Sequence, residues 1–222
     1  MSITPELLPA SWQWAGHAAY TILMVRAVRR APWAALMKNN ELMHVYLGSC
    51  VALMVLWSIK AGITPGLSFH FLGATLFTLM FGWELALVAF SLVIIGTTLS
   101  AGGAWSTYSV DVLTQGALPI LFSYGLLRIA QRRLPAHVFI YIFVNAFFGA
   151  ALAILVGSLA VAGLLGAAGT YSGEYLVSEY LAFSPLMMFS EAWITGMLIA
   201  IFVGYRPNWL LTFEDSRYLH GK

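Results

Sequence analysis

The chain has 222 residues, of which 60% are hydrophobic and 9% are charged, and its formal net charge is +2. Soluble domains carry about 25% charged residues, so this composition excludes an ordinary soluble protein and predicts a polytopic membrane protein. At about 20 residues for each membrane-spanning helix, the length suits seven spans and leaves no room for a soluble ATPase domain.

The apolar runs are continuous rather than alternating, and they therefore predict an all-α membrane protein in a single integral domain, residues 1–222. The seven predicted helices lie at 12–28, 42–60, 68–82, 84–101, 110–128, 138–166 and 179–204. We expect the first to be a permanent span and not a cleaved signal peptide. The third is short, so we expect it to be tilted, re-entrant or buried among its neighbours.

The basic residues predict the orientation in the membrane. Ten of them fall on one side of a seven-span model, namely Arg26, Arg29, Arg30, Lys38, Arg128, Arg132, Arg133, Arg206, Arg217 and Lys222, whereas Lys60 falls on the other. The positive-inside rule then places the N-terminus outside and the C-terminus in the cytoplasm. Glu6, Glu174 and Glu179 lie on the predicted outer side, where they are compatible with attraction of cations.

His70 lies near the outer end of the short third span, in a stretch without any other titratable residue. Titratable groups inside a membrane are costly and are functional candidates for that reason. An imidazole is a ligand for cobalt, nickel or zinc, so His70 is a candidate metal ligand. The alternative is a histidine that makes a hydrogen bond across a helix pair or lines a wet cavity.

Asp111 and His17 are predicted to lie at a depth similar to that of His70, and both are candidate metal ligands. Asp111 could instead cap the helix that begins at Val112, because a carboxylate accepts backbone N–H bonds and suits the positive end of a helix. His17 could instead be a packing or interface residue.

Glu191 lies in the middle of the seventh span among apolar side chains, where a carboxylate must be protonated, paired or hydrated. It either forms part of an ion path or makes a structural buried bond. Tryptophans lie near the predicted helix ends, as in an aromatic belt, at Trp12, Trp14, Trp57, Trp105 and Trp209. No catalytic motif and no basic, aromatic nucleic-acid surface is present, so we expect neither an enzyme nor a nucleic-acid-binding protein.

Several short segments, taken together, resemble one known family. They are Leu7-Leu8-Pro9 followed by Trp12, Ser68-Phe69-His70-Phe71-Leu72-Gly73-Ala74, Val110-Asp111-Val112 leading to Gly116 and Pro119, Glu191-Ala192-Trp193-Ile194-Thr195-Gly196, and Arg206-Pro207. In this order, and over nearly the whole chain, they are similar to the cobalt/nickel permeases of energy-coupling-factor transporters, the CbiM/NikM type.

The resemblance implies a component that captures a divalent ion, cobalt or nickel, from outside and works with a transmembrane coupling protein and cytoplasmic ATPases. It also implies residence in the cell membrane, the inner membrane of a bacterium, with the transported ion as ligand and no cofactor. In that family the N-terminus enters the pocket, where its amine, a backbone nitrogen and a histidine at position two bind metal. A further histidine of the family site is matched here by His70.

The chain departs from this pattern at two positions. Ser2 stands where the family has histidine, and Asp111 stands where it usually has asparagine. Removal of Met1 before a small residue would also change the terminal amine. A carboxylate beside His70 would favour oxygen-tolerant metals and partly compensate for the missing imidazole.

Two other functions remain open from the sequence. The same scaffold could have changed its substrate to another cation or a small organic molecule, because the histidine at position two is absent. Alternatively, the chain could be a membrane interaction protein that does not transport. Small residues along the sixth span, including Gly149, Ala153 and Gly157, could serve either internal packing or a membrane partner.

Overall fold

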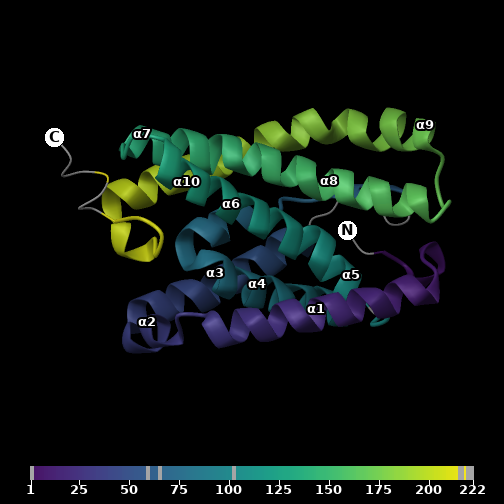
Figure 1. Cartoon of the computed structure of the whole chain (residues 1–222), viewed down its shortest axis with the longest axis horizontal. Helices are drawn as coiled ribbons and strands as arrows, with labels where there is room; N and C mark the ends of the chain where they lie inside the picture. Colours follow the sequence, from purple (N-terminus) through teal and green to yellow (C-terminus); the bar gives the residue numbers. More distant parts are fainter. Residues whose placement is uncertain (1–2, 59–60, 65–66, 102–103, 215–217, 219–222) are drawn as a thin grey trace.

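A computed structural model of the chain describes residues 3–58, 61–64, 67–101, 104–214 and 218. The predictions that concern Met1, Ser2, Lys60, Arg217 and Lys222 lie outside these residues. Within them, long helices run along the major axis of the molecule, and the connecting segments lie at its two ends (Figure 1).

The elements follow in chain order as η1 (Pro5–Leu7), α1 (Ala10–Arg30), α2 (Trp33–Lys38), α3 (Asn40–Ser58), β1 (Ala61–Thr64), β2 (Leu67–Phe69), α4 (Ala74–Ala101), α5 (Tyr108–Asp111), η2 (Val112–Ala117), α6 (Leu118–Arg133), α7 (Val138–Ile140), η3 (Tyr141–Phe148), α8 (Gly149–Ala167), α9 (Gly173–Tyr175), η4 (Leu176–Tyr180), η5 (Leu181–Phe183), α10 (Ser184–Tyr205) and η6 (Pro207–Trp209). The elements η2, η3 and η4 are π-helical, and the other η elements are 3-10 turns.

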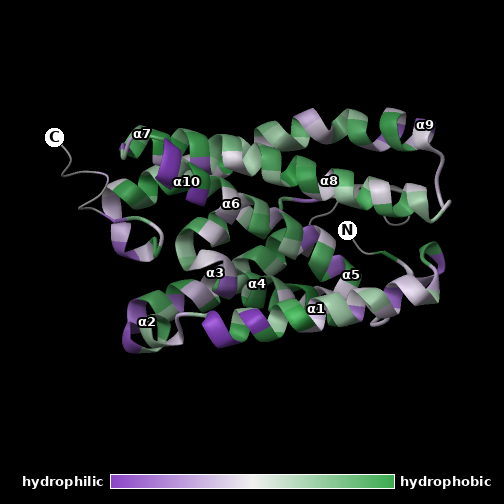
Figure 2. Cartoon of the chain, viewed as in Figure 1, coloured by the Kyte–Doolittle hydropathy of each residue, from purple (hydrophilic) through white to green (hydrophobic). Residues whose placement is uncertain are grey.

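The described residues contain five helical segments long and apolar enough to span a membrane, namely Asn40–Ser58, Ala74–Ser100, Tyr108–Arg133, Val138–Ala167 and Gly173–Tyr205. The helix α1 adds a rod of 21 residues that ends in arginines. Hydrophobic residues make up most of the length of the helices, whereas hydrophilic residues gather at α2 and the adjoining end of α1 (Figure 2). The prediction of an all-α, multi-pass membrane protein is therefore confirmed.

The helix α4 is interrupted at Gly82, where φ is 79° and ψ is 165°. This backbone region is open essentially to glycine alone, because a side chain would clash with the main chain. Packing against α3 shows how the chain runs before the break. A Cβ on Gly73 would lie 3.2 Å from a methyl group of Leu53, and the ring of Phe81 packs edge-on to Tyr46.

After the break the chain runs the other way along α3. The carbonyl of Leu85 accepts a hydrogen bond from the Tyr46 hydroxyl, and Gly96 packs against Met54. The chain therefore passes along α3 in one direction, reverses at Gly82 and returns. The predicted boundary between the third and fourth spans is confirmed at this reversal.

The predicted third helix, 68–82, is wrong in its first half. Residues 67–69 form strand β2, which pairs antiparallel with β1 so that Ala61 faces Phe69. An extended segment then leads to Ala74, where the helix begins, and Gly73 within it has a φ of 74°. An apolar run can enter a membrane protein without forming a helix only where other groups satisfy its backbone, and the partners of this segment are described below.

The core lies around α4, whose side chains are mostly buried between α1, α3, α6 and α8. The first described residues also enter the interior: Ile3 and Leu8 are buried and pack with Leu67, Val110 and Val161. The start of the chain is thus held between α5 and α8, at the end of the bundle where the β-hairpin leads into α4.

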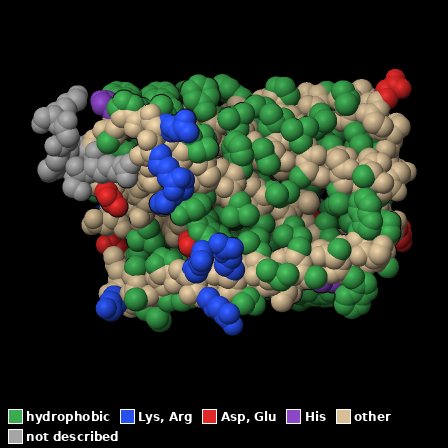
Figure 3. All heavy atoms as spheres, in the orientation of Figure 1, with side chains coloured by type: hydrophobic (Ala, Val, Ile, Leu, Met, Phe, Trp, Pro, Cys, Tyr) green, Lys and Arg blue, Asp and Glu red, His purple; other side chains and the backbone are tan. Residues whose placement is uncertain are grey.

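Basic side chains gather toward one end of the molecule. In Figure 3 the Lys and Arg side chains lie on the half of the visible face that carries α2 and the end of α6. They belong to the last turns of α1 and α6, to α2, and to Arg206 after α10. Glu174 lies at the opposite end, in α9. For the described basic residues the distribution matches the predicted one; the side of the membrane that each end faces stays a prediction.

Candidate functional site

His70 lies in the extended segment between β2 and α4 and is 8% exposed. Its Nε2 lies 3.1 Å from Oε1 of Gln115, and the Gln115 amide nitrogen donates to Oδ1 of Asp111 at 3.1 Å. The same Asp111 oxygen accepts the backbone N–H of Ile3 at 3.1 Å. A continuous buried chain of polar groups therefore connects the imidazole with a carboxylate and with the start of the chain.

The contacts of the two ring nitrogens of His70 decide which of them can carry the proton. Nδ1 lies 3.1 Å from the carbonyl oxygen of Phe71, and a carbonyl oxygen can only accept a hydrogen bond. The Gln115 Oε1 atom that faces Nε2 is likewise an acceptor only, so a neutral ring donates to Phe71 or to Gln115 but not to both. The tautomer with the proton on Nδ1 is the one in which proteins hold a metal-binding imidazole, because one nitrogen then donates to a fixed acceptor and Nε2 can bind the ion.

Trp57, near the end of α3, packs against the imidazole. The two ring centroids are 4.3 Å apart with the planes tilted by 47°, and Trp57 is 2% exposed. Among the residues that the structure describes, its indole Nε1 finds no hydrogen-bond partner. The prediction that Trp57 anchors the protein at the membrane surface is wrong, because this ring forms the wall behind His70.

Asp111 and Gln115 lie four residues apart on the helix formed by α5 and η2, and both are buried. The side chain of Asp111 makes no capping bond to the following helix, so that interpretation is wrong. Its carboxylate holds Ile3 instead, and the Thr107 hydroxyl donates to the carbonyl of the same residue. Both backbone groups of Ile3 are thus fixed by residues at the start of this helix.

Glu191, in α10, makes the structural buried bond that was one of its two interpretations. One carboxylate oxygen accepts the backbone N–H of Leu72 at 2.8 Å, and the other accepts that of Gly73 at 2.6 Å. Glu191 therefore satisfies the N–H groups of the extended segment that carries His70, which explains why this segment needs no helix there.

His17 is not brought into this network. Its Nδ1 lies 2.7 Å from the Ser109 hydroxyl, and its ring packs edge-on to Trp14. In the described part of the chain, no group of three or more His, Cys, Asp or Glu side chains is placed to hold a metal ion. The contacts of His17 are those of the packing residue that was its alternative interpretation, and a metal bound by His70 and Asp111 would need the Gln115 amide or backbone donors as well.

Sequence reasoning missed Gln115 and Trp57. Gln115 had one usable signal, because it is a polar residue four positions after Asp111 and two such residues lie on one helix face. Trp57 had none, since only the packing of α3 against the extended segment brings it to His70.

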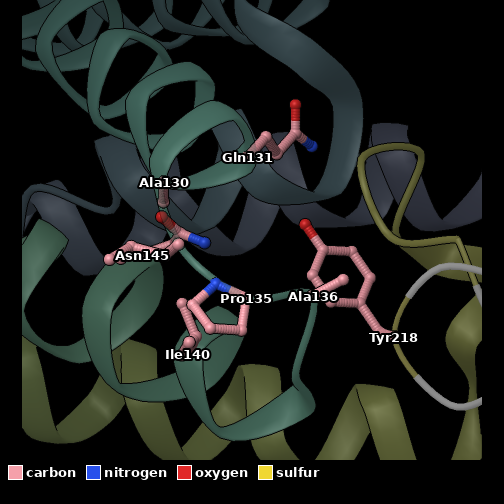
Figure 4. Close-up of a pocket in the computed structure, with 8 residues that line it drawn as sticks. Ala130, Gln131, Pro135, Ala136, Ile140, Asn145 and Tyr218 are labelled. Carbon is pink, nitrogen blue, oxygen red and sulfur yellow. The ribbon is translucent and has the colours of Figure 1, made fainter. Parts of the chain in front are cut away.

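Two cavities are lined by residues outside the chain from His70 to Asp111. A space of about 10 Å³, enough for one water, lies by the turn between α6 and α7 and is lined by Ala130, Gln131, Leu134, Pro135, Ala136, Ile140, Asn145 and Tyr218 (Figure 4). An apolar groove of about 210 Å³ between α3, α4 and α10 is lined by Val45, Ser49, Ala52, Leu53, Leu56, Phe71, Leu76, Phe77, Met80, Ile194, Leu198, Phe202 and Trp209. Neither collects ligands for a metal.

Comparison with known proteins gives one family and one fold. The family model CbiM, described as the cobalt uptake substrate-specific transmembrane region, matches residues 2–209. No curated protein sequence matches the chain.

Two solved structures, described as a truncated transition metal transporter and a transition metal transporter, each superpose with a TM-score of 0.76 at 18% identity. Each covers 92% of this chain, and the matches cover 99% and 93% of theirs. At this identity the likeness shows a shared fold.

Proposed function

Because the chain belongs to the CbiM family of cobalt uptake substrate-specific transmembrane proteins, we propose that it captures a divalent transition-metal ion, cobalt or nickel, for uptake across the cell membrane. The transition metal transporters that share its fold support the same class of substrate. The observation that carries the proposal is the buried chain from His70 through Gln115 to Asp111.

The atoms in this chain suit such an ion. An imidazole nitrogen, a carboxylate and an amide oxygen are ligands that cobalt, nickel and zinc accept. Gln115 lies between the other two groups, with its Oε1 3.1 Å from Nε2 of His70 and its amide nitrogen donating to Asp111. A bound ion would take bonds to Nε2 of His70 and to oxygens of Gln115 and Asp111.

The start of the chain would complete the site. Ile3, the first described residue, donates its backbone N–H to Asp111 and so lies directly beside a proposed ligand. Capture would proceed by loss of water from the ion, binding at His70 and Asp111, and donation from N-terminal groups. Release would follow when a transmembrane coupling protein and ATPases reorient this component, the partners that its resemblance to energy-coupling-factor permeases implies.

Calorimetric titration of the purified protein with cobalt and nickel tests the proposal. Loss of a direct ligand should cost more than the roughly 10- to 100-fold in metal affinity that supporting residues contribute, so His70→Ala should lower affinity at least about 100-fold. His44→Ala removes an exposed imidazole from α3 and should leave affinity unchanged. Absence of binding of both metals to the wild-type protein would overturn the proposal.

One observation favours a second candidate, a changed substrate on the same scaffold. His70 is the only imidazole in the described chain of polar groups, and its other members offer oxygen. A different cation, or a small molecule with hydrogen-bonding groups, would suit such a site. Thermal stabilisation of the purified protein by such a ligand, together with indifference to cobalt and nickel, would support this candidate.

A further inference from the structure

Glu191 binds the segment next to His70 in a specific way. Its carboxylate accepts the N–H groups of two consecutive residues, Leu72 and Gly73, with one oxygen each, and the side chain is 2% exposed. The bond pair therefore fixes the backbone of this segment to α10, although the two lie about 120 residues apart in the sequence.

One of these bonds falls on the peptide group that also orients His70. The N–H that Glu191 accepts from Leu72 belongs to the same trans peptide as the carbonyl of Phe71, whose oxygen lies 3.1 Å from Nδ1 of His70. In a trans peptide the N–H and the C=O point in opposite directions, so the carboxylate lies on one side of the peptide and the imidazole on the other. The carboxylate also polarises the peptide and makes its carbonyl a better acceptor.

We propose that Glu191 is a positioning residue for His70 and acts through the single peptide group between Phe71 and Leu72. The arrangement is a carboxylate–peptide–histidine relay, which extends by one peptide the carboxylate–histidine pairs found behind metal-binding imidazoles. By strengthening the Phe71 carbonyl as an acceptor, it favours the tautomer with the proton on Nδ1 over the one in which Nε2 donates to Gln115. The part that concerns metal affinity rests on the function proposed above.

Glu191→Gln tests the relay. The amide keeps the size of the side chain, but its NH₂ group meets one of the two N–H donors and cannot accept from it. Supporting residues behind metal ligands contribute about 10- to 100-fold in affinity, so cobalt affinity should fall within that range. Glu174→Gln removes an exposed carboxylate from α9 and should change nothing. Glu191→Asp keeps the charge at a shorter reach and should give an intermediate loss.

A second measurement tests the relay in the absence of metal, through the position of the proton on the His70 ring. Nitrogen-15 spectra of labelled histidine distinguish a ring protonated on Nδ1 from one protonated on Nε2, and comparison with His70→Ala identifies the His70 signals. The wild-type ring should be protonated on Nδ1, and Glu191→Gln should shift the population toward Nε2. This readout would not respond to a merely structural role of Glu191 elsewhere in the bundle.

The two readouts separate the relay from the proposed function. A wild-type protein that binds no metal would remove the function, and the histidine spectra would still decide on the relay. Spectra of His70 that are the same in the wild type, in Glu191→Asp and in Glu191→Gln would overturn the relay. If Glu191→Gln does not fold, the spectrum of Glu191→Asp decides in the same way.

Discussion

The Asp111 carboxylate binds two separate parts of the structure. One of its oxygens accepts both the Gln115 side chain and the backbone of Ile3, so the carboxylate joins the proposed ligand set to the start of the chain. An asparagine there would keep one acceptor and replace the other oxygen with a donor. Replacement of Asp111 by asparagine would therefore alter both charge and hydrogen bonding beside Ile3.

We expect Asp111→Asn to lower the affinity for cobalt or nickel about 10-fold, since hydrogen bonds and contacts to a charged group are worth roughly 1.5–3 kcal/mol each. Exchange of the Ile3 amide with deuterium should also become faster, because its acceptor is weakened. Calorimetry and mass-detected hydrogen exchange measure the two effects. Glu179→Gln, at an exposed position of η4, is the control. Unchanged metal binding and uptake in Asp111→Asn would rule out a ligand role for this carboxylate.

His70 and Asp111 could be selected from the sequence because titratable residues are rare in apolar runs. The sequence could not show that Gln115 joins them, since an amide carries no comparable cost and many amides are merely packed. It also could not show that His17 pairs with Ser109 instead, because equal depth in a membrane does not specify which side of a helix faces which neighbour.

At the scale of elements, the third predicted span shows what a hydrophobicity pattern cannot predict, namely the conformation of a short apolar segment. Its short length predicted a tilted, re-entrant or buried segment, and the structure shows that the helix begins only at Ala74. Hydrophobicity alone cannot distinguish a strand from a helix in a short apolar run, and the strand β2 depends on pairing with β1. The extended residues after it depend on Glu191, a partner that only the tertiary structure supplies.

Gly82 should be the most sensitive glycine of this reversal. Its φ of 79° and ψ of 165° lie in a region that costs other residues about 1–3 kcal/mol, so Gly82→Ala should destabilise the protein by that amount. A Cβ there would meet only the Glu84 carboxylate, at 3.3 Å, and the cost is therefore mainly backbone strain.

Thermal unfolding in detergent measures the effect of Gly82→Ala. Gly125→Ala is the matched control, because Gly125 is helical, in α6, and a Cβ there would contact nothing within 4 Å. Alanine is the better helix former, so the control should be neutral or slightly stabilised. Equal stability of Gly82→Ala and the wild type would show that the chain can reverse without the glycine conformation.

At the scale of the whole molecule, the fold separates charge along its length. The ends of α1 and α6 carry arginines at the same end of the bundle, whereas α9 and η4 carry Glu174 and Glu179 at the other (Figures 1 and 3). His70 follows the β-hairpin, near the level at which the start of the chain packs. If the arginine end is cytoplasmic, the candidate site lies toward the outer side, as capture from outside requires.

Cysteine labelling tests this orientation, and with it the direction of transport. The wild-type chain has one cysteine, Cys50, which is buried and should not react with a membrane-impermeant maleimide, so it serves as the blank. In intact cells Glu174→Cys should react and Arg133→Cys should not, because these exposed residues lie at opposite ends of the bundle. After permeabilisation both should react. The reverse pattern would place His70 toward the cytoplasm, where it could receive an ion only from within the cell, and capture for uptake would then have to be abandoned even if His70 binds metal.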